Sequence, residues 1–158
     1  MPVQNFAHLG ICVADPERSL HFYCDLLGFR RLTKLVVSDP GSARLVGLEN
    51  LELHSYFVER DAVRIELLHY VSPGYEEGTV ARPMNRRGLT HMALRVEGFG
   101  EMLEQIEQAG FEIMKASQIG GPDAGVQVVY VLDPDGVRVE LIDMPGDPMQ
   151  PLGEPLPS

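Results

Sequence analysis

The sequence has little of three features that would each define a class of protein: cysteine, basic residues and long apolar runs. Its 158 residues include two cysteines, Cys12 and Cys24, too few for a disulfide framework, so we expect a cytoplasmic protein with free thiols. Lysine and arginine total 13 against 23 acidic residues, a charge of −10 that argues against nucleic acid as a partner. No apolar run approaches the roughly 20 residues of a membrane helix, and the first residues do not resemble a signal peptide.

The composition is that of a folded globular chain, and the chain repeats itself. Apolar residues make up 44% and charged residues 23%, which is ordinary globular usage. Residues 61–68 read Asp-Ala-Val-Arg-Ile-Glu-Leu-Leu and residues 135–142 read Asp-Gly-Val-Arg-Val-Glu-Leu-Ile, with five of eight positions identical. A weaker match joins residues 6–11 to residues 89–94, and a helical stretch closed by Gly-Phe follows each. These matches occur in the same order, which indicates a duplicated module.

Each module is predicted to fold as strand, helix and three further strands, which makes an α+β fold. The first module should have strands over residues 6–13, 31–37, 51–58 and 62–70. The second should have strands over residues 89–96, 111–115, 126–132 and 137–144. Asp15 is the expected N-cap of the first helix, and Gly28 and Gly110 are the expected left-handed stops of the two helices.

The domain organisation follows from the repeat. The first module spans residues 1–70 and the second spans residues 89–144. Residues 71–88 are rich in proline, glycine and charge and are interpreted as the linker. Residues 145–158 contain five prolines, too many for a helix or a central strand, so an extended tail is expected.

Strand alternation predicts that one histidine and one glutamate of each module share a face. His8 and Glu66 lie opposite the aliphatic positions of the first module, and His91 and Glu140 do so in the second. Two imidazoles and two carboxylates that converge on one point suit a divalent ion such as Zn, Ni, Co, Mn or Fe(II). Such a set leaves one or two coordination positions for water or substrate if the ion is five- or six-coordinate.

A structural interpretation of the same strands is also open. Arg64 with Glu66, and Arg138 with Glu140, could form surface ion pairs on a solvated face, worth under about 1 kcal/mol each. For any single residue this interpretation is favoured. The repetition of a His–Glu pair in both modules favours the metal site.

Several motifs resemble the vicinal oxygen chelate superfamily. The sequence His-Leu-Gly-Ile at residues 8–11, before a helix that ends in Leu-Gly-Phe at residues 27–29, is similar to the opening of that fold. Asp-Pro-Asp-Gly at residues 133–136, before Val-Glu-Leu at residues 139–141, is similar to its closing hairpin. The resemblance covers residues 5–144 as one domain.

The resemblance implies two tandem βαβββ modules that form a cupped mixed sheet around a metal site. The superfamily's ligand positions fall on His8, Glu66, His91 and Glu140. This set is similar to that of bacterial glyoxalase I, whereas methylmalonyl-CoA epimerase has Gln at the second position. In some relatives the site lies across two chains, so a homodimer is expected.

Other members of the superfamily have more different metal-ligand sets. Two positions of this sequence also depart from the pattern of glyoxalase I. Extradiol dioxygenases and fosfomycin-resistance enzymes use two His and one Glu, and bleomycin-binding proteins lack the metal set. Cys12 stands where bacterial glyoxalase I has an Arg that grips glutathione, and Tyr70 stands near the place of a glutathione-binding Asn. The acidic segment of the epimerase is also missing, so the substrate stays open.

The implied function is that of a metal-dependent lyase, isomerase or epimerase with a small-molecule carbonyl substrate. A proton next to the metal-chelated carbonyl would be transferred through an enediolate, with Glu66 or Glu140 as the base. Two alternatives are an Fe(II) extradiol-type dioxygenase and a metal-free small-molecule binding or resistance protein.

Overall fold

The computed structural model describes residues 2–77, 83–121, 123–150, 153 and 156, and its contacts divide the chain into two units. The first unit consists of residues 1–87 and 133–137, and the second consists of residues 88–132 and 138–158. Each unit contains a four-stranded mixed sheet, which confirms the predicted α+β class. Among the described helices, none is long and apolar enough to cross a membrane.

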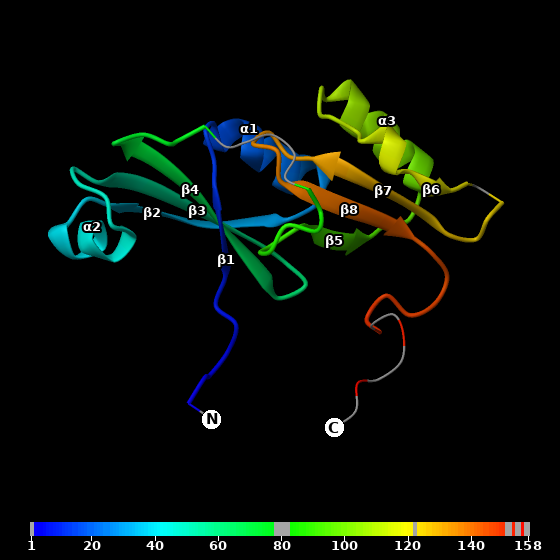
Figure 1. Cartoon of the computed structure of the whole chain (residues 1–158), viewed down its shortest axis with the longest axis horizontal. Coiled ribbons are helices and arrows are strands. Elements are labelled where there is room, and N and C mark those ends of the chain that lie inside the picture. Colours follow the sequence, from blue (N-terminus) through cyan, green and yellow to red (C-terminus); the bar gives the residue numbers. More distant parts are fainter. Residues whose placement is uncertain (1, 78–82, 122, 151–152, 154–155, 157–158) are drawn as a thin grey trace. The chain divides into compact units, whose positions relative to one another are not determined.

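The sheet of the first unit has the order β1-β4-β3-β2 (Figure 1). Its strands are β1 (Leu9–Cys12), β2 (Arg30–Val37), β3 (Glu52–Arg60) and β4 (Val63–Ser72). β1 runs parallel to β4, and the other neighbours are antiparallel. Ile65 and Leu67 of β4 are buried while Glu66 between them is partly exposed, so the strand has one core face and one open face.

The helix between β1 and β2 begins and ends where the sequence predicts. The Asp15 side chain accepts hydrogen bonds from the backbone N–H groups of Glu17 and Arg18, which caps α1 (Pro16–Leu20). The chain continues as a π-helical segment, η1 (His21–Leu26), and ends at Gly28, whose φ of 73° lies in the left-handed region. Phe22 and Tyr23 of η1 are wholly buried, so this segment supplies much of the core of the first unit.

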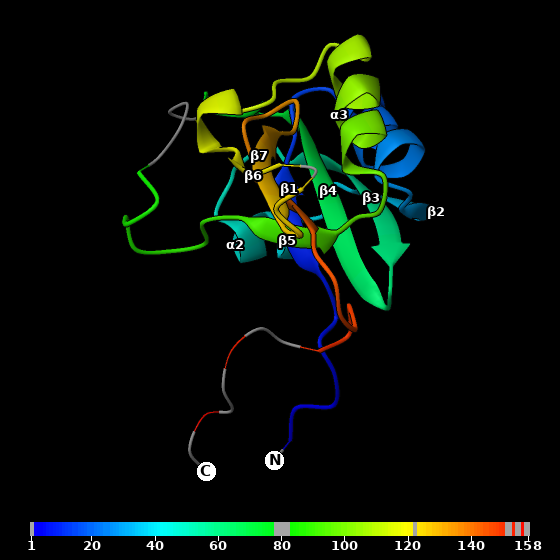
Figure 2. The same cartoon turned by 90° about the vertical axis from the view of Figure 1, so that its right-hand side faces the viewer.

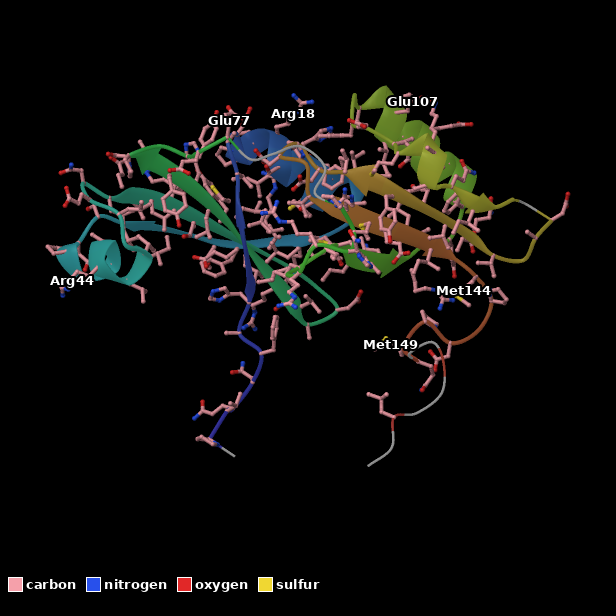
Figure 3. All side chains as sticks on the ribbon, viewed as in Figure 1. Arg18, Arg44, Glu77, Glu107, Met144 and Met149 are labelled. Atoms are coloured by element: carbon pink, nitrogen blue, oxygen red, sulfur yellow. The ribbon has the colours of Figure 1, made fainter. Side chains whose placement is uncertain are left out.

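A second helix in this unit, α2 (Pro40–Val46), was not predicted. Its Asp39 cap accepts hydrogen bonds from the N–H groups of Gly41 and Ser42, and its last turn closes at Gly47 with φ 73°. It lies beside the ends of β2 and β3 (Figure 1), and Arg44 projects outward from it (Figure 3). None of its residues is buried, so it has no apolar stripe for a sequence pattern to detect.

The sheet of the second unit has the order β5-β8-β7-β6. Its strands are β5 (Met92–Arg95), β6 (Ile119–Gly120), β7 (Gln127–Leu132) and β8 (Arg138–Asp143). Helix α3 (Phe99–Gln108) buries Phe99 and Ile106 and packs against β8, while Glu107 projects from its outer side (Figure 3). After β8 the chain runs on without helix or strand through residues 145–150 (Figure 2).

The prediction of a strand at residues 111–115 is wrong. Only Ile113 forms an isolated bridge, to Val131, and the third strand of this sheet is the short β6 instead. A 3-10 turn, η2 (Lys115–Ser117), intervenes, and the Ser117 hydroxyl accepts a hydrogen bond from the N–H of Tyr130. The Ser117 side chain therefore accepts a hydrogen bond from β7 that the backbone of a continuous strand would have accepted.

The turn at residues 133–137 belongs to the first unit although it follows β7 in the chain. Asp133 Oδ1 accepts hydrogen bonds from the N–H groups of Asp135 and Val137, and Oδ2 accepts one from the Tyr23 hydroxyl at 2.7 Å. Asp135 accepts a hydrogen bond from the Ala14 N–H at 2.9 Å. Burial raises the pKa of the Asp133 carboxyl despite these donors. The turn of the second repeat is thus tied to the first helix.

Candidate functional site

The first unit brings His8 and Glu66 together. His8 Nε2 lies 3.0 Å from Glu66 Oε2, and the side chains are 42% and 15% exposed. Glu66 is opposite Phe57 in the antiparallel register of β3 and β4, and the Phe57 ring meets the His8 ring edge-on at 5.6 Å. The pair therefore lies on the open face of the sheet, as the alternation predicts.

The second unit repeats this arrangement with His91 and Glu140. His91 Nε2 lies 3.2 Å from Glu140 Oε2, and both side chains are partly exposed. Glu140 is opposite Tyr130 in the register of β7 and β8, and the Tyr130 ring meets the His91 ring at 5.4 Å. His91 Nδ1 is also 2.9 Å from the Thr90 hydroxyl, which orients the imidazole with Nε2 toward the carboxylate.

The donor atoms of each pair fit a shared metal ion. Two ligands at about 2.1 Å from one ion and at right angles to each other are about 3.0 Å apart. The separations in the two units, 3.0 and 3.2 Å, are those of a histidine–carboxylate ion pair, and nitrogen and oxygen donors at this spacing could also hold one divalent ion. In the part of the chain that the structure describes, no group of three or more His, Cys, Asp and Glu side chains is placed to hold an ion. The structure thus brings the four predicted residues together as two His–Glu pairs.

The interpretation of Arg64 and Arg138 as surface partners of the site glutamates is wrong. Arg64 Nε donates to Glu59 at 2.8 Å, not to Glu66. Arg138 is only 9% exposed, and it forms no ion pair with Glu140. The glutamates of both units face histidines instead.

Sequence reasoning missed Tyr130 as a neighbour of the site. Burial raises the pKa of its phenol, and the Glu140 charge and a hydrogen bond with that carboxylate raise it further. The Tyr130 phenol therefore lies close to the Glu140 carboxylate. Counting outward from the turn at residues 133–136 would have placed it opposite Glu140, because hairpin register follows from the turn.

Cys12 and Tyr70 share the open face of the first unit with Glu66. Burial raises the pKa of the Cys12 thiol, and the nearby Asp135 charge adds to this effect, so the group stays protonated at neutral pH. Burial also raises the pKa of Tyr70, and the charges of Cys12 and Glu66 raise this pKa further. Both departures from the glyoxalase I pattern therefore lie close to the first His–Glu pair.

His54 and His69 lie on the other face, opposite each other in the register of β3 and β4. His69 Nδ1 is 3.3 Å from the carbonyl oxygen of Val13, and His54 Nε2 is 3.0 Å from Glu52. Neither histidine shares the face of Glu66. These contacts give both residues a structural role.

The chain belongs to the glyoxalase/bleomycin resistance protein/dioxygenase superfamily, whose family profile matches residues 5–141. A probable lactoylglutathione lyase of Synechocystis sp. is 32% identical over 137 residues, which cover 85% of this chain and 92% of that relative.

Solved structures share the fold. A glyoxalase family protein from Bacillus cereus has a TM-score of 0.79 at 18% identity and covers 92% of this chain and 97% of its own. A point mutant of the fosfomycin resistance protein FosX from Listeria monocytogenes, complexed with Mn(II) and a dihydroxypropylphosphonic acid, has a TM-score of 0.58 at 16% identity. That alignment covers 88% of this chain and 91% of the FosX chain. Proteins with different names therefore share this architecture.

Proposed function

We propose that the protein is a metal-dependent lyase or isomerase that transfers a proton next to the carbonyl group of a small molecule. One observation carries the proposal: each repeat sets an imidazole nitrogen and a carboxylate oxygen 3.0 to 3.2 Å apart at equivalent positions. A relative at 32% identity named as a probable lactoylglutathione lyase supports this reaction class.

In this proposal His8, Glu66, His91 and Glu140 hold one divalent ion. The four residues come from one chain or from the two chains of a homodimer. When bound, the ion supplies Lewis-acid stabilisation of the charge that develops on the substrate oxygens, worth several kcal/mol. The FosX structure contains Mn(II), so this architecture accommodates a divalent ion in at least one other protein.

The chain's own residues supply the proton transfer. Glu66 or Glu140 takes the proton, because a carboxylate at the ion is already within reach of a substrate bound there. Thr90 orients His91 through its Nδ1 atom, and the partial burial of both glutamates limits the access of water. Phe57 and Tyr130 pack their ring edges against the two histidines and so restrict the imidazole orientations.

The test combines metal analysis with proton exchange. Purified protein is dialysed without chelator, its metal content is measured, and substrate proton exchange in D2O is followed by NMR. The substrates are the hemithioacetal of methylglyoxal and glutathione, methylmalonyl-CoA and catechol. Glu66→Gln and Glu140→Gln should each lower the metal content and abolish exchange. Glu107→Gln, on the exposed side of α3, should change neither.

Three outcomes would contradict the proposal. Full exchange in both glutamine variants would exclude the glutamates as ligands and base. Oxygen uptake with catechol would indicate a dioxygenase instead. Wild-type protein without stoichiometric metal would indicate a metal-free binding protein.

A further inference from the structure

Arg138 is a nearly buried cation without an anionic partner in the described part of the chain. It begins β8, two residues before Glu140, and is 9% exposed. No described side chain accepts a hydrogen bond from it or forms an ion pair with it within residues 2–77, 83–121 and 123–150. With its stem covered, the guanidinium keeps only part of its hydration and has no counter-ion in the described chain, so an anion from outside the chain would be favoured beside it.

The first repeat provides an internal comparison. Arg64 occupies the equivalent position, two residues before Glu66, but its side chain is 47% exposed. Its Nε donates to Glu59 at 2.8 Å, and the same carboxylate pairs with Arg30 at 2.7 Å. The position therefore carries a neutralised surface arginine in one repeat and a buried arginine without a described partner in the other.

Arg138 belongs to the open face that carries the second His–Glu pair. Residues 138 and 140 of a strand point to the same side. In the register of β7 and β8, Arg138 lies opposite Leu132 and Glu140 lies opposite Tyr130, so both pairs project on the same face. Tyr130 in turn contacts the His91 ring. The guanidinium therefore lies within electrostatic range of the residues that surround the His91–Glu140 pair.

The guanidinium nitrogens remain accessible to a ligand. Among the described residues, every fully buried side-chain nitrogen or oxygen has a hydrogen-bond partner. Because Arg138 has no partner there, its nitrogens must reach the surface while its stem is covered. This leaves the planar donor fork available to a group that approaches along the open face.

We propose that Arg138 binds a carboxylate group of the ligand that occupies the His91–Glu140 side of the site. A guanidinium can donate two parallel hydrogen bonds to a carboxylate, a geometry that lysine does not reproduce. The substrate is therefore an anionic carbonyl compound, with its carboxylate at Arg138 and its reacting carbon toward Glu140. The reaction part of this statement rests on the proposed function; the carboxylate site at Arg138 does not.

The test observes the arginine side chain directly. The Nε–Hε signals of Arg138 and Arg64 are assigned by NMR with the variants Arg138→Gln and Arg64→Gln. Wild-type protein is then titrated with propanoate and, separately, with the uncharged isostere propanamide, at constant ionic strength. Zn(II)-loaded and chelator-treated protein are both used, so that the result does not depend on metal binding.

We expect propanoate to shift the Arg138 signal saturably in both preparations, while propanamide leaves it unchanged. The Arg64 signal should not move, because Glu59 already accepts its hydrogen bond. Arg138→Gln should weaken propanoate binding at least about tenfold, measured on the Tyr130 amide signal. Arg64→Gln should bind as wild type does. Arg138→Lys, which retains the charge, should bind with intermediate affinity and serves as the test if the glutamine variant does not fold.

An unmoved Arg138 signal, equal shifts of Arg138 and Arg64, or wild-type affinity in the Arg138 variants would overturn this proposal. Failure of the protein to retain Zn(II) would count against the proposed function alone, since the chelator-treated titration still decides the role of Arg138. The two proposals can therefore fail separately.

Discussion

Tyr130 is the counterpart of Phe57 in the second repeat. Each ring lies on the strand next to the glutamate-bearing strand, opposite Glu140 or Glu66, and each meets a histidine ring edge-on, at 5.4 and 5.6 Å. The two positions differ by one hydroxyl group, and the Glu140 charge raises the pKa of that phenol after burial does. The repeats therefore place similar ligands in different surroundings.

Removal of that hydroxyl should weaken metal binding. Partners of metal ligands typically contribute 10- to 100-fold to affinity, so Tyr130→Phe should bind a divalent ion about tenfold more weakly. Competition with a chromogenic chelator measures the change. Tyr56→Phe, the same loss of a phenol hydroxyl on the face away from Glu66, is the control and should retain wild-type affinity, since Tyr56 lies opposite Leu67 in the register. Equal affinity of Tyr130→Phe and wild type would contradict the role given to the phenol.

Asp133 should make the protein less stable as the pH rises. Burial raises the pKa of this carboxyl in the folded state, so the folded chain holds the proton more tightly than the unfolded chain does. Its contribution is complete below about pH 4, the ordinary carboxyl value, and is lost as the pH rises through the higher folded value. Asp133→Asn should therefore gain stability relative to wild type between about pH 4 and about pH 7.

Urea unfolding at both pH values measures this difference. Asparagine can still accept from the N–H groups of Asp135 and Val137 and can donate to the Tyr23 oxygen, so the turn should remain intact. Asp147→Asn, at an exposed position, is the control and should show no such pH trend. A constant difference between Asp133→Asn and wild type would refute the expectation.

Gly28 and Gly110 should respond differently to the same substitution. Both have positive φ, 73° and 79°, so alanine costs about 1–2 kcal/mol at either position. A Cβ at Gly28 would also meet Arg60 Nη1 at 2.6 Å, and this nitrogen donates to the Leu27 carbonyl. Nothing lies within 4 Å of a Cβ at Gly110. Gly28→Ala should therefore be the more destabilising change in thermal unfolding, and an added Arg60→Ala should reduce the difference.

Removal of metal should lower the thermal stability. An ion present at a hundredfold its Kd stabilises the folded state by about 2.7 kcal/mol. A chelator should therefore lower the Tm by roughly 5–10 °C in a chain of this size. The double variant Glu66→Gln/Glu140→Gln should show no decrease with chelator. A Tm that does not respond to chelator in the wild type would argue against a bound ion.

Features that repeat with a fixed period were accessible from the sequence. The alternation around Glu66 and Glu140 predicted the open faces, and the cap at Asp15 predicted the start of α1, because both depend on near neighbours in the chain. Helix α2 was missed because its capping signals, Asp39 and Gly47, bracket a segment that buries nothing. Periodicity reports on burial, so it does not detect a helix that lies on the surface.

Features that depend on contacts with a neighbouring strand could not be predicted from the sequence. Arg64 and Arg138 stand in nearly identical octapeptides, yet one is exposed and the other is nearly buried. The strand expected at residues 111–115 failed for a similar reason, since Ser117 bonds to Tyr130 across a distance that local pattern does not report. Both differences depend on contacts with a neighbouring strand, to Glu59 of β3 and to Tyr130 of β7, which the periodicity of a single segment does not report.

The turn at residues 133–137 determines which fragments of the chain contain the whole first unit. Its carboxylates accept the Tyr23 hydroxyl and the Ala14 amide, so the first unit is assembled from two separate stretches of the coding sequence. A fragment that stops at the boundary of the duplication would leave that phenol facing no acceptor in the core. The first copy is therefore not a complete structural unit without residues 133–137 of the second.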